Sequence, residues 1–169
     1  MGRAMVLELK KGADGPPTLS CVRQDGSRTW GKVHRFIPVH DLTHCAVETV
    51  LEFEDAVLGL VASGWSLDDF TSREAAARLP VEAHWAESIV GLLDLERGTG
   101  KEWTATEFNV ALSESLRDQK ITPFRALDLD ELARTRRLRD DLQRRWEELE
   151  PGGTLEIPFP ASAPQGERR

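Results

Sequence analysis

Cysteine is scarce in this chain, which contains only Cys21 and Cys45 among its 169 residues. Two cysteines cannot form the set of disulfides that holds a small secreted domain together. The chain also lacks a positively charged amino-terminal stretch followed by an apolar run, which is the pattern of a secretory signal. We therefore expect a cytoplasmic protein in which both thiols are reduced.

Long apolar stretches and an excess of positive charge are missing as well. Acidic residues, including Glu48, Glu52 and Asp55, interrupt the most hydrophobic segment, and a membrane-spanning helix needs roughly 20 apolar residues in succession. The formal net charge is −7 and the pI is near 5.2. Because such a surface repels phosphate backbones and anionic lipids on average, we expect neither nucleic acid nor a membrane as a partner.

The composition is that of an ordinary globular protein, with 40% hydrophobic and 30% charged residues. The length suits one domain with a core of its own. We therefore predict a single domain over residues 1–160 and a disordered tail over residues 161–169, where apolar residues are rare.

Four segments have the composition of β-strands, and the turn between two of them has a hairpin signal, Asp25-Gly26. Three strands are expected near the amino terminus and one after Pro151-Gly152-Gly153, where the last helix must end. The four predicted strands are residues 5–11, 18–24, 28–34 and 154–159.

Between these strands the apolar residues recur with a helical period. One helix is predicted from about Val39 to Ala62, and another begins at Pro80 and ends near Gly98. Further helix starts are indicated where a capping residue is followed three positions later by Glu, at Thr71, Thr104 and Asp128. The predicted fold class is α+β, with a small antiparallel sheet of three amino-terminal strands and one carboxy-terminal strand, covered by four to five helices.

The segment FIPVHDLTHCAVE, residues 36–48, contains the strongest functional signal. His40, His44 and Glu48 are spaced four residues apart, so on a helix they lie along one stripe. Two imidazoles at this spacing can bind a common metal ion, as in the helices of zinc proteases. We therefore predict a divalent metal, zinc or iron, with these three residues as its ligands.

Additional residues could complete such a site. A fourth ligand could come from His34, or from His84 and Glu87 on the helix that follows Pro80. Asp41 and Glu52 are the predicted catalytic residues, because each could orient a ligand or relay a proton.

The same segment resembles known proteins in two ways. Together with the run GLVASGW, residues 59–65, it is similar to a segment of small uncharacterised bacterial proteins. The element His40-Asp41-x-x-His44 also resembles the zinc motif of the Coq4-like family of ubiquinone biosynthesis, which implies a zinc site. That motif has a glutamate where this chain has Ala56, so Glu48 or Glu52 would have to replace it. An adjacent His-Asp pair also occurs in HD-domain phosphohydrolases, which need a more distant upstream histidine than His34.

Two classes of function follow from these residues. In the first, the chain is a small metal-dependent hydrolase or lyase that acts on a small-molecule ligand. In the second, it is a non-enzymatic ligand-binding or protein-interaction module. The histidines then form a polar pocket without metal, or are structural residues with hydrogen-bond partners of their own. Nothing in the sequence indicates the oligomeric state.

An arginine-rich helix near the carboxy terminus is the one segment that could oppose the acidic average. Acidic residues are interleaved with the arginines at distances that favour salt bridges, so we expect a solvated helix that does not bind nucleic acid. The six arginines are Arg134, Arg136, Arg137, Arg139, Arg144 and Arg145.

Overall fold

The computed structural model describes residues 4–32 and 37–161, which form an α+β fold. The strands are β1 (Met5–Lys10), β2 (Thr18–Arg23), β3 (Arg28–Lys32) and β4 (Thr154–Phe159). The helices are α1 (Ile37–Val50), α2 (Val57–Ala62), the short 3₁₀ helix η1 (Leu67–Thr71), α3 (Arg73–Ala76), α4 (Val81–Thr99), α5 (Ala105–Asp118) and α6 (Leu129–Glu147). None of the described helices combines the length and the apolar character that a membrane crossing requires.

The four strands form one antiparallel sheet in the order β3-β2-β1-β4. The closing strand therefore pairs with β1. Leu7 of β1 lies opposite Cys21 of β2 and Ile157 of β4, and all three side chains are buried. Since side chains alternate along a strand, this register directs one apolar face of the sheet toward the helices.

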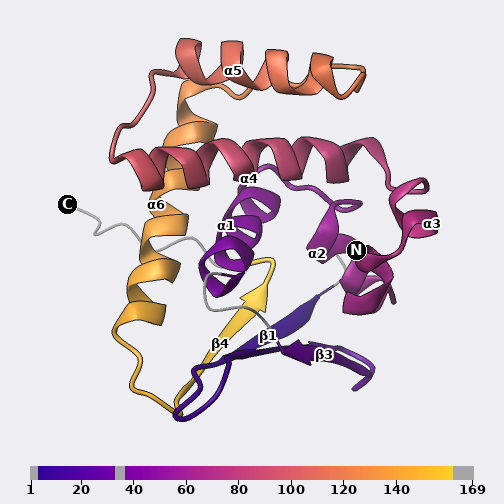
Figure 1. Ribbon diagram of the computed structural model, residues 1–169, viewed down its shortest axis with the longest axis vertical. Helices are drawn as coiled ribbons and strands as arrows, with labels where there is room; N and C mark the ends of the chain where they lie inside the picture. The colour runs from indigo at the N-terminus through magenta and orange to yellow at the C-terminus, as the bar shows by residue number, and fades with distance from the viewer. Residues whose placement is uncertain (1–3, 33–36, 162–169) are drawn as a thin grey trace.

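The helices cover that face in successive layers. Figure 1 shows α1 between the sheet and α4, with α6 packed alongside and α5 on the far side of α4. Helix α1 is buried along most of its length because it contacts both α4 and α6. Polar side chains of α1 that face α4 are thereby placed inside the molecule.

The helix predicted from Val39 to Ala62 is wrong in one respect, because it breaks into α1 and α2. Glu52 adopts a left-handed conformation with φ of 54°, and the Phe53 amide donates to the Glu48 carbonyl oxygen over 3.0 Å, which ends α1. The chain then turns so tightly that a Cβ on Gly59 would collide with the Glu54 carbonyl. Apolar residues keep their helical spacing across the turn, so the periodicity did not reveal it.

Most of the other predicted helix boundaries agree with the structure. Thr104 and Asp128 begin α5 and α6 with reciprocal capping boxes, as predicted. Pro80 is the N-cap of α4, and Gly100, in a left-handed conformation, follows its last turn. The start predicted at Thr71 is displaced by one residue, because Ser72 provides the cap of α3. Cys21 and Cys45 are free and buried.

Candidate metal centre

Helices α1 and α4 bring two histidines and a glutamate together. One ligand atom each of His40, His44 and Glu87 can be chosen so that all three lie within 4.8 Å of one another. The Nε2 atom of His44 is 3.3 Å from Oε1 of Glu87, and the two imidazole centroids are 4.9 Å apart. The prediction that the two histidines point to one side and meet a carboxylate is confirmed, and the geometry of this group is compatible with metal binding.

The Nδ1 atom of each imidazole contacts a further carboxylate, which does not belong to the three-residue group. Nδ1 of His40 lies 2.8 Å from Oδ2 of Asp94, and Nδ1 of His44 lies 3.1 Å from Oε1 of Glu48. Because Nδ1 of each ring faces a carboxylate, Nε2 is the nitrogen left for a metal ion. Carboxylates in this position fix the orientation of ligand histidines and raise their basicity.

Glu48 was predicted as the third ligand, but the structure gives it other partners. Its carboxylate accepts hydrogen bonds from the backbone amides of Leu58 at 2.8 Å and Gly59 at 3.1 Å, in addition to its contact with His44. The side chain is fully buried. The third member of the three-residue group is Glu87 of α4, whose side chain is half exposed.

Asp94 is the residue that sequence reasoning missed. It lies seven positions after Glu87, two turns along the same face of α4, and this spacing is its only signal in the sequence. Thr43 donates to its Oδ1 over 3.4 Å, and Gln143 of α6 donates to the hydroxyl of Thr43 over 3.1 Å. The hydroxyl proton of Thr43 also has the Val39 carbonyl oxygen as an acceptor, at 2.9 Å. Asp94 thus lies where polar groups of α1, α4 and α6 meet.

The electrostatics of His44 depend on its two carboxylate neighbours. Burial lowers the pKa of this imidazole, but its hydrogen bonds to Glu48 and Glu87 outweigh burial and raise the pKa to about 10. Burial raises the pKa of Glu87, and the hydrogen bond to His44 more than compensates, so that its pKa lies below the usual value. This raised pKa favours the protonated form of His44 between the two carboxylates while no metal ion is bound.

Asp41 adds a further negative charge beside this group. Burial raises the pKa of its carboxyl to about 6, while the charges of His44 and His40 oppose that rise. Its Oδ2 atom is buried and has no hydrogen-bond partner among the described residues. No lysine or arginine in the described part of the chain forms an ion pair with Asp41, Glu48 or Glu87. The cluster is therefore rich in carboxylates and poor in permanent cations.

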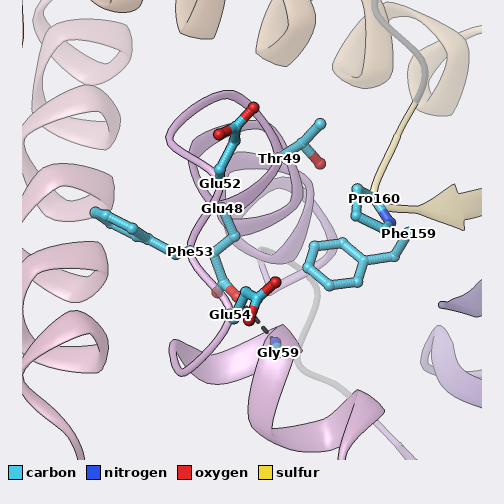
Figure 2. A pocket seen from close by; sticks show the side chains of 8 residues that line it. All are labelled: Glu48, Thr49, Glu52, Phe53, Glu54, Gly59, Phe159 and Pro160. Atoms are coloured by element: carbon cyan, nitrogen blue, oxygen red, sulfur yellow. Dashed lines mark hydrogen bonds between the residues drawn. The ribbon is translucent and has the colours of Figure 1, made fainter. Parts of the chain in front are cut away.

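The remaining predicted residues lie at different distances from the group. His84 is one turn before Glu87 on α4, and its charge lowers the pKa of Glu87, but it is not a member of the three-residue group. His34 lies outside the described residues. Glu52 is exposed in the turn after α1, and Figure 2 shows it directed away from Glu48, which points toward Gly59.

A pocket of about 310 Å³ adjoins the carboxy-terminal end of α1. Its wall includes Glu52 and the rings of Phe53 and Phe159, which Figure 2 shows on opposite sides of the helix end. Glu48 also lines this pocket, and its carboxylate is already occupied by His44 and by the amides of α2. Neither His40 nor His44 is among the described residues that line this pocket.

Comparisons of the chain with protein-family models, with curated proteins and with solved structures gave no match. The site is therefore interpreted from its own chemistry.

Proposed function

We propose that the chain binds a divalent transition metal, zinc or iron, through His40, His44 and Glu87. Two imidazoles and one carboxylate form the ligand set of many catalytic zinc sites and of non-haem iron sites, and both leave coordination positions open. The observation that carries the proposal is the pair of carboxylates, Asp94 and Glu48, which fix both imidazoles through Nδ1.

The charge balance around Asp41 supports the same proposal. Three acidic side chains, Asp41, Glu48 and Glu87, interact with the buried imidazole of His44, and one Asp41 oxygen is buried with no hydrogen-bond partner among the residues that the structure describes. Removing such a charge from water is costly unless a cation compensates it. A dication would supply that compensation better than the single proton of His44.

The activity we propose is that of a small metal-dependent hydrolase or lyase. A metal in such a site polarises a substrate oxygen or lowers the pKa of bound water. The protein would orient the imidazoles through Asp94 and Glu48, and Asp41 would hold a polar group of the ligand. The set of possible fourth ligands still includes His84, one turn from Glu87, and His34.

A second candidate function needs no metal. The raised pKa of His44 means that a protonated imidazole can bridge Glu48 and Glu87 as a structural ion pair. The chain would then be a ligand-binding or protein-interaction module whose histidines stabilise the contact between α1 and α4.

Elemental analysis of the protein, expressed without a histidine tag in medium containing zinc and iron, separates the two candidates. We expect about one equivalent of metal in the wild-type protein, and a loss of most of it in His44→Gln and in Glu87→Gln. Glu114→Gln, at an exposed position on α5, is the matched control and should keep its metal. A wild-type content below about a tenth of an equivalent would contradict the metal proposal and leave the structural ion pair.

A further inference from the structure

A groove between α4 and α5 begins at the candidate metal centre. Its volume is about 220 Å³. Glu87 belongs both to the metal-ligand group and to the wall of this groove. The residues that line it are Glu87, Ser88, Gly91 and Leu92 of α4 and Ser115 and Gln119 of α5. A molecule lying in the groove would therefore reach the group at its exposed carboxylate.

Gly91 keeps this groove open. It lies one turn after Glu87 and about one turn before Asp94, on the face of α4 that carries both carboxylates. Glycine is a much poorer helix former than alanine in a helix interior. An added Cβ would meet no atom within 4 Å, so close packing does not require glycine at this position. The effect of Gly91 is open space beside the ligand group.

The groove is lined by neutral hydrogen-bonding groups. The amide nitrogen of Gln119 donates to the hydroxyl of Ser88 over 3.0 Å and to the hydroxyl of Ser115 over 3.2 Å. These bonds hold the amide in place, and its oxygen accepts no hydrogen bond from the residues that the structure describes. Glu87 is the only charged side chain among the described residues of the lining. The described lining therefore offers no lysine or arginine for a charge-assisted hydrogen bond to a phosphate or a free carboxylate.

We propose that this groove is the substrate subsite of the metal centre and takes a small, neutral molecule with hydrogen-bonding groups, such as an amide or a hydroxylated carbonyl compound. The inference rests on the proposed metal function. The body of the molecule lies over Gly91, its donor groups face Gln119 and the serines, and its reactive oxygen is directed to the metal held by Glu87 and the histidines.

Spectroscopic titration of the cobalt(II)-loaded protein tests this inference with two hydroxamates of different size. Hydroxamates bind metals through two oxygens, so acetohydroxamate probes the metal and benzohydroxamate probes the metal and the groove together. In Gly91→Leu, the added side chain fills the groove. We expect benzohydroxamate to bind this variant about tenfold more weakly than wild type, in line with the usual cost of overpacking, and acetohydroxamate to change much less.

Gly98→Leu is the matched control, because Gly98 also lies on α4 with open space around its Cα and is not part of the groove. It should bind both hydroxamates as the wild type does. Both leucine variants should fold, since each replaces an exposed helical glycine with a better helix former. If wild-type protein binds no cobalt, the metal proposal fails and this inference with it. If cobalt binds but Gly91→Leu leaves benzohydroxamate binding unchanged, the groove assignment alone is overturned.

Discussion

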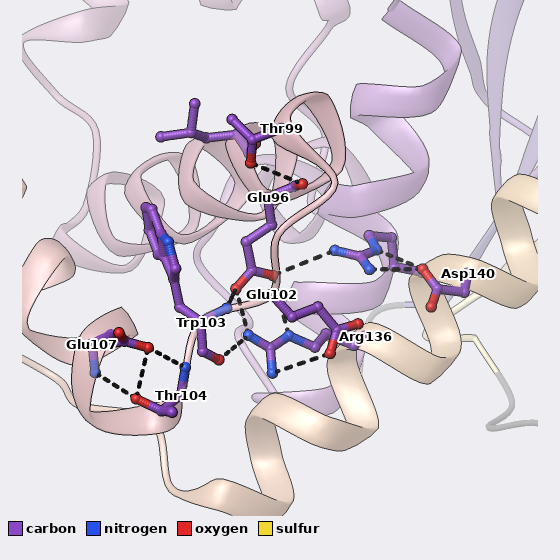
Figure 3. A network of polar contacts seen from close by, with 10 residues as sticks. Glu96, Thr99, Glu102, Trp103, Thr104, Glu107, Arg136 and Asp140 are labelled. Atoms are coloured by element: carbon purple, nitrogen blue, oxygen red, sulfur yellow. Dashed lines mark hydrogen bonds and ion pairs between the residues drawn. The ribbon is translucent and has the colours of Figure 1, made fainter.

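Two of the carboxylates on helix α4, those of Glu87 and Glu96, lie in different electrostatic surroundings. Glu96 is buried and meets two arginines of α6, as Figure 3 shows. The guanidinium of Arg136 donates to both of its oxygens, Arg139 lies 3.9 Å away, and the Trp103 amide donates to Oε1 over 2.9 Å. Glu87, nine residues earlier, meets the imidazole of His44 instead.

The two clusters therefore differ in the kind of cation that they contain. A guanidinium keeps its charge at every pH at which the protein is folded, so the partners of Glu96 are permanent. An imidazole can release its proton and offer the same nitrogen to a metal ion. The comparison teaches that buried charge in this fold is used in two ways: the arginine cluster fixes α4 against α6, whereas the histidine cluster can exchange one cation for another.

Loss of Glu96 should give the largest effect. Glu96→Ala leaves Arg136 without its buried carboxylate, and breaking a buried ion pair in this way costs about 3–5 kcal/mol. Arg139 loses a neighbour at 3.9 Å but keeps its ion pair with Asp140. Glu87→Ala should cost less than about 1 kcal/mol in the metal-free protein, because the Glu87 side chain is half exposed. Urea unfolding of both variants, with metal removed by a chelator, measures the difference. Equal losses would mean that both clusters are structural.

Asp94→Asn should give an intermediate effect, on metal affinity rather than on folding. The substitution keeps the shape of the side chain but removes the charge that holds Nδ1 of His40. Loss of such an outer carboxylate typically lowers metal affinity about 10-fold to 100-fold. Titration against a competing chelator measures the change, and Asp118→Asn on the exposed end of α5 serves as the control. An unchanged affinity would remove Asp94 from the site.

Local sequence signals predicted the fold well where neighbouring residues decide the structure. The alternating strands and the capping boxes at Thr104 and Asp128 needed no information from distant residues. The break between α1 and α2 depends on Glu48, whose carboxylate bonds to the first amides of α2. That contact becomes visible only once the chain has turned back, so the period of the apolar residues extended the helix too far.

The candidate site shows the same limit. His40 and His44 could be predicted because their spacing places them on one stripe of one helix. Glu48 was preferred over Glu87 for the same reason, yet the crossing of α1 and α4 brings Glu87 to Nε2 of His44 and leaves Glu48 at Nδ1. Asp94 was missed because its function depends entirely on that crossing.

For the arginine-rich helix, α6, the sequence predicted salt bridges between the arginines and acidic residues of the same helix. Arg144 forms such pairs, with Asp141 and Glu148. Arg136 instead reaches Glu96 of α4, a partner that no spacing within α6 could indicate. Arg139 pairs with its neighbour Asp140 and also lies 3.9 Å from Glu96. The expectation that the helix does not bind nucleic acid stays a prediction.

The smallest effect, opposite in sign to that at Glu96, should come from Asp41. Burial raises the pKa of its carboxyl from its ordinary value of 3.8 to about 6, so the folded protein holds this proton more tightly than the unfolded chain does. The stability that results is fully present below about pH 4 and is lost as the pH rises through about 6. Above that pH, the metal-free protein contains an ionised Asp41 whose Oδ2 atom has no hydrogen-bond partner in the described part of the chain.

Asp41→Asn removes that charge and should stabilise the metal-free protein at pH 8 by about 1 kcal/mol. This is less than the free energy that corresponds to the pKa shift, because the amide of asparagine must also lose its water on burial. Thermal melts of wild type and variant at pH 4 and pH 8 measure the difference in stability. The difference should be nearly zero at pH 4, because the wild-type carboxyl is protonated there. A variant that is instead destabilised at pH 8 would show that protonated His44 already compensates Asp41. The histidine cluster would then resemble the arginine cluster, and its need for a second cation would disappear.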